Sequence, residues 1–166
     1  MSDATPEGVV SASSDAGGVK IVRIFDAPRE EVFDAWIVPE RFANWFGERG
    51  SSLPLDKLSM DVRPGGAWSA VMIYGPDKIE IPFSGHYREV MRPERLVLTM
   101  ADPTGVESDR VELMTVVLED IGEGRTRMTF TQTGGNLPAD EYSRAMAGEL
   151  IFLERLGEEL KARHDI

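Results

Sequence analysis

Residues 138–163 read PADEYSRAMAGELIFLERLGEELKAR and carry the longest regular pattern in the chain. Pro138 suits the first turn of a helix, because its ring fixes φ at a helical value and that turn needs no N–H from it. Apolar side chains then recur at intervals of three and four residues and so share one helix face: Tyr142, Met146, Leu150, Leu153, Leu156 and Leu160. At a rise of 1.5 Å per residue the helix is about 39 Å long. We therefore expect it to lie across a whole sheet.

Most of the chain before this helix has the composition of β-strands. The run VKIVRIF at residues 19–25 is rich in β-branched and aromatic residues, which favour strands. Six further segments of this kind are separated by turns, near residues 57–63, 67–74, 79–90, 95–101, 110–119 and 125–133. Connections this short join antiparallel neighbours. The sequence thus predicts an α+β, helix-grip fold: a curved seven-stranded antiparallel sheet around a long C-terminal helix, with an internal cavity as the by-product of the curvature.

Two short helices are expected after the first strand. Pro28 suits the first turn of one helix, and Pro39 interrupts it and starts a second that ends at Gly47. Residues 1–18 are rich in Ser, Ala, Gly and Asp, which is typical of a flexible N-terminal tail. A strand through Val9 and Val10 is the alternative there. The folded domain is expected to cover residues 19–166.

The composition narrows the classes of function. The formal net charge is −11, whereas nucleic acids and anionic membranes are bound chiefly through Lys and Arg, so we expect no nucleic-acid partner. No segment has the roughly 18 consecutive apolar residues of a membrane span; we expect no membrane insertion and a cytoplasmic location. There is no cysteine, and neither histidine has a ligand partner at regular spacing. We expect no metal and no cofactor, while a homodimer stays open.

Several short motifs occur in the order found in a known superfamily. They read APRE at 27–30, WFG at 45–47, DVRPGG at 61–66, GHYRE at 85–89 and PERL at 93–96. Together with the order of elements, they make residues 19–163 resemble the SRPBCC (START-like, birch-pollen-allergen-like) superfamily, and within it the family named after the activator of heat-shock-protein-90 ATPase. The resemblance implies a hydrophobic cavity between the sheet and the long helix. It implies no particular reaction, since members include lipid and polyketide binders, cyclases and co-chaperone-like modules.

The walls of the expected cavity need apolar and aromatic side chains. Rings, adaptable methionines and one leucine of the long helix are the candidate ligand-binding residues: Trp36, Trp45, Trp68, Met72, Tyr74, Phe83, Tyr87, Met100, Met146 and Leu153. Each of them is alternatively ordinary core. Because side chains alternate across a strand, His86 and Tyr87 point to opposite faces, and we expect Tyr87 inside and His86 on the surface.

Glu149 is the polar candidate for this cavity. Many relatives have Gly-Trp in the long helix where this chain has Gly148-Glu149, three residues after Met146 and four before Leu153. The position lies on or beside the apolar face. Inside a cavity, the carboxyl would have a raised pKa and could donate or accept a proton near neutral pH; at the rim it would face water. The sequence leaves both positions open.

Three functions are compatible with these observations. The first is the binding of a hydrophobic small molecule, such as a lipid, polyketide or aromatic metabolite, in a cavity on the order of several hundred Å³. The second is a cyclase or isomerase that uses Glu149 as acid or base, with no other catalytic residue predicted. The third is a co-chaperone-like interaction module; we expect no chaperone partner, because the chain is short beside the two-domain activator that gives the family its name.

Overall fold

A computed structural model describes residues 8–101, 111–135 and 137–164. Within these ranges nine antiparallel strands form one sheet in the order β1-β2-β9-β8-β7-β6-β5-β3, and β4 also pairs with β5. The strands are β1 (Val9–Asp15), β2 (Gly18–Phe25), β3 (Ser51–Ser52), β4 (Ser59–Met60), β5 (Ala67–Tyr74), β6 (Ile79–Met91), β7 (Arg95–Ala101), β8 (Val111–Gly122) and β9 (Arg125–Thr133). The predicted antiparallel sheet is therefore confirmed, with β1 and β3 added to it.

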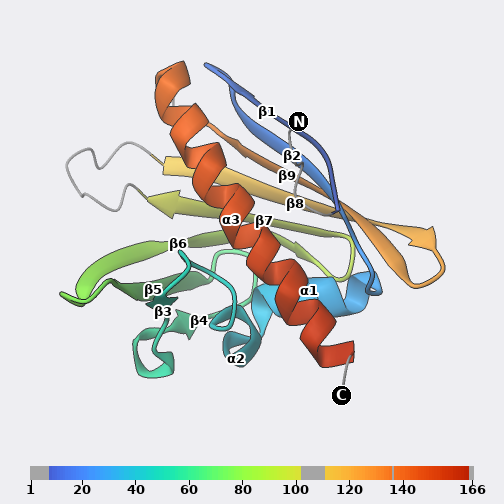
Figure 1. The fold of residues 1–166 in the computed structure, drawn as a ribbon, viewed down its shortest axis with the longest axis horizontal. Helices are drawn as coiled ribbons and strands as arrows, with labels where there is room; N and C mark the ends of the chain where they lie inside the picture. Colours follow the sequence, from blue (N-terminus) through green and yellow to red (C-terminus); the bar gives the residue numbers. More distant parts are fainter. Residues whose placement is uncertain (1–7, 102–110, 136, 165–166) are drawn as a thin grey trace.

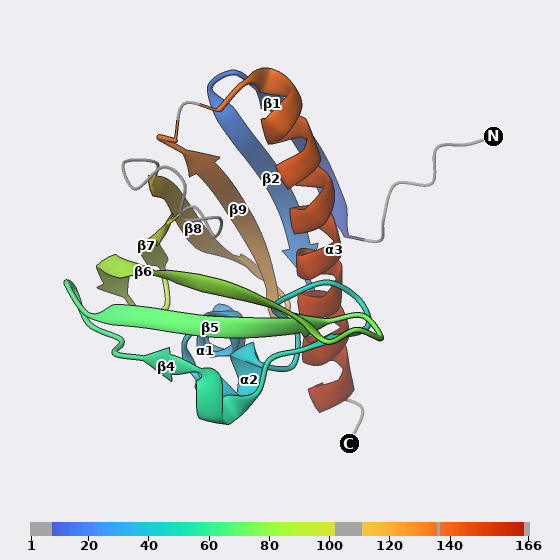
Figure 2. The same ribbon diagram turned by 90° about the vertical axis from the view of Figure 1, so that its left-hand side faces the viewer.

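The long C-terminal helix is also confirmed. The helices are α1 (Arg29–Ile37), α2 (Pro39–Phe42), the 3-10 helix η1 (Leu55–Lys57) and α3 (Ala139–His164). α3 runs diagonally across the sheet (Figure 1), and a second view shows the sheet curving from β1 and β2 round to β6 and β5, with α3 closing the open side (Figure 2). Within the described ranges no helix combines the length and the apolar character needed to cross a membrane.

The N-terminal segment differs from the expected flexible tail over residues 1–18. Val9–Asp15 forms the edge strand β1, and the N–H of Gly17 in the following turn donates to Asp15 Oδ1 at 2.6 Å. Most β1 side chains are exposed, so backbone hydrogen bonds to β2 hold this strand rather than apolar burial. The alternative of a strand through Val9 and Val10 is the one that the structure shows. Residues 1–7 lie outside the described residues.

Two predicted elements are shorter in the structure. The strand expected at 57–63 is reduced to β4, because η1 precedes it and the backbone N–H of Arg63 already donates to the carbonyl of Asp61 within the next turn. The second short helix ends at Phe42 rather than Gly47. The N–H groups of Asn44 and Trp45 donate to carbonyls three residues back, so the chain continues as tight turns after α2.

The concave face of the sheet carries the core. Alternate residues of β8 and β9 point inward and are buried, as the two-residue period of a strand requires: Met114, Val116 and Leu118 on β8, and Thr126, Met128, Phe130 and Gln132 on β9. The apolar face of α3 packs against them through Leu153, Leu156 and Leu160. Where β8 begins and β9 ends, the same inward rows become polar, at Glu112 and Gln132.

Candidate functional site

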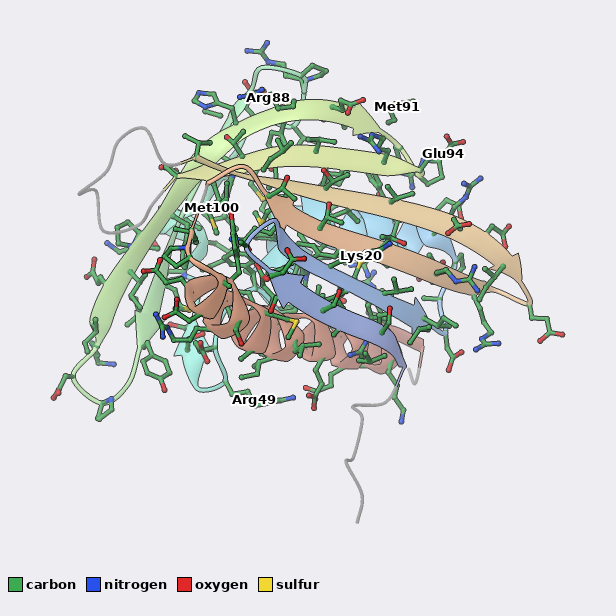
Figure 3. All side chains as sticks on the ribbon, turned by 90° about the horizontal axis from the view of Figure 1, so that it is seen from above. Lys20, Arg49, Arg88, Met91, Glu94 and Met100 are labelled. Carbon is green, nitrogen blue, oxygen red and sulfur yellow. The ribbon has the colours of Figure 1, made fainter. Side chains whose placement is uncertain are left out.

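A cavity of about 160 Å³ lies between the concave face of the sheet and α3. Buried side chains form its inner wall: Trp36 of α1, Trp45 and Phe46 of the turns after α2, Met114, Phe130 and Leu153. Partly exposed residues form its outer wall: Phe83, Met100, Ala145, Gly148 and Phe152. Figure 3 shows Met100 between the strands and α3. The cavity thus extends from the core toward the surface, and it is smaller than the several hundred Å³ expected.

Aromatic rings give the cavity stiff walls. Trp36 meets Trp45 edge-on, with ring centroids 4.7 Å apart, and stacks on Phe130 at 6.2 Å. Phe46 meets Phe83 edge-on at 5.4 Å. Offset and edge-to-face contacts of this kind stabilise ring clusters beyond their apolar area. Each ring is therefore held by at least one other ring, which favours a preformed cavity.

The turns that carry two of these rings are fixed to α3. Arg155 donates from Nη1 to the carbonyl oxygens of Gly47, at 2.8 Å, and Glu48, at 3.0 Å. Gly47 has φ 123°, and a Cβ there would lie 2.9 Å from Met72 Sδ. Only glycine fits this position without strain. The WFG motif therefore combines two wall residues with the glycine that lets the chain turn behind them.

Four polar residues meet at one side of the cavity, and we call them the polar cluster: Glu112, Gln132, Tyr142 and Glu149. The Gln132 amide faces Glu149 and can donate to Oε2 and, at 3.3 Å, to Oε1. The Tyr142 hydroxyl donates to Oε1 and Oε2 of Glu112 at 3.2 and 3.3 Å. Only Gln132 and Glu149 belong to the cavity wall. Within the described ranges no group of three or more acidic or histidine side chains is placed to hold a metal ion.

The structure places Glu149 on the cavity wall, partly buried, which settles the two positions that the sequence left open. Burial, and after it the negative charge of Glu112, raises the pKa of Glu149 to about 8. The carboxyl is therefore mostly protonated at neutral pH. An amide donates to a carboxylate through its nitrogen and accepts from a carboxylic acid through its oxygen. Gln132 can consequently pair with Glu149 in both protonation states.

The cavity brings together some of the predicted site residues. Trp36, Trp45, Phe83, Met100, Glu149 and Leu153 all line it. Trp68 does not, because the rings of Phe42 and Phe46 pack against it, and its Nε1 donates to the Thr99 carbonyl at 2.9 Å. Met72 is buried, and its Sδ accepts from the Glu48 N–H at 3.3 Å. Both are core residues rather than wall residues.

Three other predicted site residues also lie elsewhere. Tyr74 is 41% exposed, because it is the last residue of β5 and lies beyond the turns that cover Met72. Tyr87 is buried as predicted, but it lies toward the 61–66 turn, where burial and then the charge of Asp61 raise its pKa. Met146 packs against the core outside the cavity. The prediction that His86 is exposed is confirmed.

The sequence reasoning did not select several wall residues, of which Gln132 matters most. Gln132 lies on the inward row of β9 with Phe130, and its neighbour across the sheet is Met114. Strand alternation carried this signal, since every second residue from Met128 faces inward. The pairing of Gln132 with Glu149, however, depends on where α3 crosses the sheet. That crossing is not encoded in any local pattern.

A curved antiparallel sheet closed by a long helix over an apolar cavity defines the helix-grip class of protein. The chain belongs to the family described as "Activator of Hsp90 ATPase homolog 1-like protein", which matches residues 26–161. The resemblance stated from the motifs is thereby confirmed. Proteins of this fold commonly bind hydrophobic ligands. A search of curated proteins finds no significant match.

Solved structures with this fold come from several bacteria. A protein of Arthrobacter aurescens is 26% identical, with a TM-score of 0.74, covering 93% of this chain and 92% of that one. The AHSA1 protein of Silicibacter pomeroyi is 23% identical, with a TM-score of 0.74, covering 89% and 99%. A protein of Staphylococcus epidermidis is 19% identical, with a TM-score of 0.75, covering 93% and 95%. At these identities the likeness shows the fold, and the site must be argued from its own residues.

Proposed function

We propose that this protein binds a hydrophobic small molecule in the cavity between its sheet and α3. The observation that carries the proposal is the cavity itself: a volume of about 160 Å³ enclosed by aromatic, methionine and leucine side chains on one side and bordered by partly exposed residues on the other. Burying a ligand against such walls contributes about 25 cal/mol per Å² of apolar area removed from water. The apolar chemistry of these walls suits lipids, polyketides and aromatic metabolites, and the volume decides how much of such a molecule lies inside.

The test is native mass spectrometry of the protein as purified from its source. The variant Ala145→Phe fills the cavity from its outer wall, and Ala147→Phe adds the same ring to an exposed position of the same helix. We expect wild type and Ala147→Phe to retain a small-molecule adduct, and Ala145→Phe to lose it. Circular dichroism checks that both variants fold. Equal retention by all three proteins would contradict the proposal, and so would unliganded wild type that no hydrophobic compound in a panel stabilises against heat.

Glu149 supports a second candidate function, a cyclase or isomerase. A carboxyl with a pKa of about 8 on the wall of an apolar cavity can give or take a proton near neutral pH. Gln132 faces this carboxyl from β9, and both residues line the cavity. In this case Glu149→Gln retains the bound ligand but does not convert it, whereas wild type converts it. Equal conversion by both proteins would remove the catalytic candidate and leave the binding function intact.

A further inference from the structure

The size of the cavity limits the ligand. Apolar cavities of about 150 Å³ hold one benzene-sized ring, and the cavity here has about 160 Å³. A fused ring system or a long acyl chain would have to extend out of the cavity or displace its walls. The walls are interlocked rings, such as Trp36 with Trp45 and Phe130. A single ring with one or two small substituents is the size class that fits without such movement.

Two tryptophans of the inner wall differ in their polar atom. Trp45 Nε1 donates to the carbonyl of Ala35 at 2.8 Å. Trp36 is 3% exposed, and its Nε1 has no hydrogen-bond partner among the described residues. A buried N–H without an acceptor is destabilising, because it has lost its hydrogen bond to water and gained none in the fold. An oxygen on a ligand in the cavity that Trp36 lines would supply the acceptor that the described residues do not.

The remaining polar groups of the wall determine which charge the ligand can carry. Gln132 and Glu149 together can donate to a ligand oxygen or accept from a ligand hydroxyl. No Lys or Arg lines the cavity within the described residues, so an anionic ligand would be buried without a counter-ion. A cation would suit Glu149 as a carboxylate, but it would leave the N–H of Trp36 without an acceptor. An uncharged oxygen group can accept from Trp36 or pair with Glu149 and Gln132, and it needs no counter-ion.

We propose that the cavity binds an uncharged molecule with a single aromatic ring and a hydroxyl or carbonyl oxygen, which accepts from Trp36 Nε1 or pairs with Glu149 and Gln132. This inference rests on the proposed binding function and narrows it to one class of ligand. The ring packs between aromatic and methionine side chains, and the oxygen gives the ligand its orientation. Para-substituted phenols are the simplest members of the class, because they remain neutral at pH 7.

The experiment compares four probes of one size by isothermal titration calorimetry and by two-dimensional NMR of the tryptophan side-chain N–H groups. The probes are p-cresol, p-xylene, benzoate and benzylamine. We expect p-cresol to bind about 5- to 10-fold more tightly than p-xylene, which corresponds to one or two added hydrogen bonds. The side-chain N–H signal of Trp36 should shift with p-cresol more than with p-xylene. Benzoate and benzylamine should bind more weakly than p-cresol.

Two tryptophan variants test the role of Trp36 Nε1. Trp36→Phe keeps a ring in the wall but removes the N–H, and we expect it to reduce the preference for p-cresol over p-xylene. Trp68→Phe is the matched control, because Trp68 lies outside the cavity and its Nε1 donates to Thr99. It should leave the preference unchanged. If p-cresol binds no more tightly than p-xylene to either wild type or Trp36→Phe, the assigned polar contact is wrong.

Larger uncharged probes separate this inference from the proposed function. If 2-naphthol or 1-decanol binds wild type but not Ala145→Phe, while p-cresol does not bind, the cavity is a binding site but the ligand class is wrong. Tightest binding by benzoate or benzylamine would overturn the class in the same way. If none of the six probes binds wild type, both the inference and the binding function fail.

Discussion

Two glutamates of α3, ten positions apart, differ in the partner of their carboxyl group. Glu159 is buried and accepts from Nε and Nη2 of Arg41 at 3.3 and 3.4 Å. Glu149 is partly buried on the cavity wall beside the Gln132 amide, and no Lys or Arg of the described residues forms an ion pair with it. Glu159 is therefore paired with a cation across two elements of the fold. A carboxyl beside a neutral amide and a second carboxylate can change its charge.

The difference assigns different roles to the middle of the helix, at Glu149, and to its C-terminal part, at Glu159. Near Glu159, charged side chains fasten α3 to the segment after α1: Arg41 reaches Glu159, and Arg49 reaches Glu154 and Glu158 at 3.1 and 2.6 Å. Near Glu149, the helix borders a cavity. The charges near Glu159 link α3 to that segment, whereas Glu149, together with Gln132, forms part of the cavity wall.

The largest effect is expected at the buried ion pair. Among the described residues, Arg41→Met leaves Glu159 with the distant Nη1 of Arg163, at 4.0 Å, as its one remaining cation. Removing one partner of a buried pair is destabilising by about 3–5 kcal/mol, because the remaining charge stays buried. We expect a loss of about 3 kcal/mol in the free energy of unfolding, measured by urea denaturation. The double variant Arg41→Met with Glu159→Leu should recover most of the lost stability. If Arg41→Met alone is as stable as wild type, Glu159 needs its cation no more than Glu149 does.

The second effect is on the pH dependence of stability. The pKa of Glu149 is about 8 in the folded protein, above the ordinary 4.5 of a glutamate side chain. Because the folded state holds the proton more tightly, Glu149 lowers the free energy of unfolding as the pH rises from about 5 to about 8. Glu149→Gln removes this loss.

The measurement is urea denaturation of wild type and Glu149→Gln across that pH range. We expect the two proteins to be similar at pH 5 and the variant to be more stable by about 2 kcal/mol at pH 8. This is roughly half of what linkage gives for the full shift, since the side chain is partly exposed. Parallel stability curves for the two proteins would mean that Glu149 titrates in the folded protein as it does in the unfolded chain.

The comparison also shows what the sequence could and could not predict. The spacing of apolar residues and the turn residues predicted the antiparallel sheet and α3. They also placed Glu149 on or beside the apolar face of α3, because these features depend on local patterns. The strand β1 was expected only as the alternative to a flexible tail, since most of its side chains are exposed and backbone hydrogen bonds hold it. Gln132 and Arg41 were not selected, because each acquires its role only from the part of α3 that crosses it. The placement of one element relative to another is set by packing, and packing depends on several segments of the sequence at once.

The smallest effect is expected from the second carboxylate of the polar cluster. Glu112→Gln removes the negative charge that contributes to the raised pKa of Glu149, while its amide oxygen can still accept from Tyr142. The pKa of Glu149 should fall, by less than burial raises it, since burial is the larger cause. A ¹³C NMR titration of the glutamate side-chain carboxyls measures this shift directly. An unchanged pKa would mean that burial alone sets the proton affinity of Glu149, and that the two carboxylates do not act on each other across the sheet and the helix.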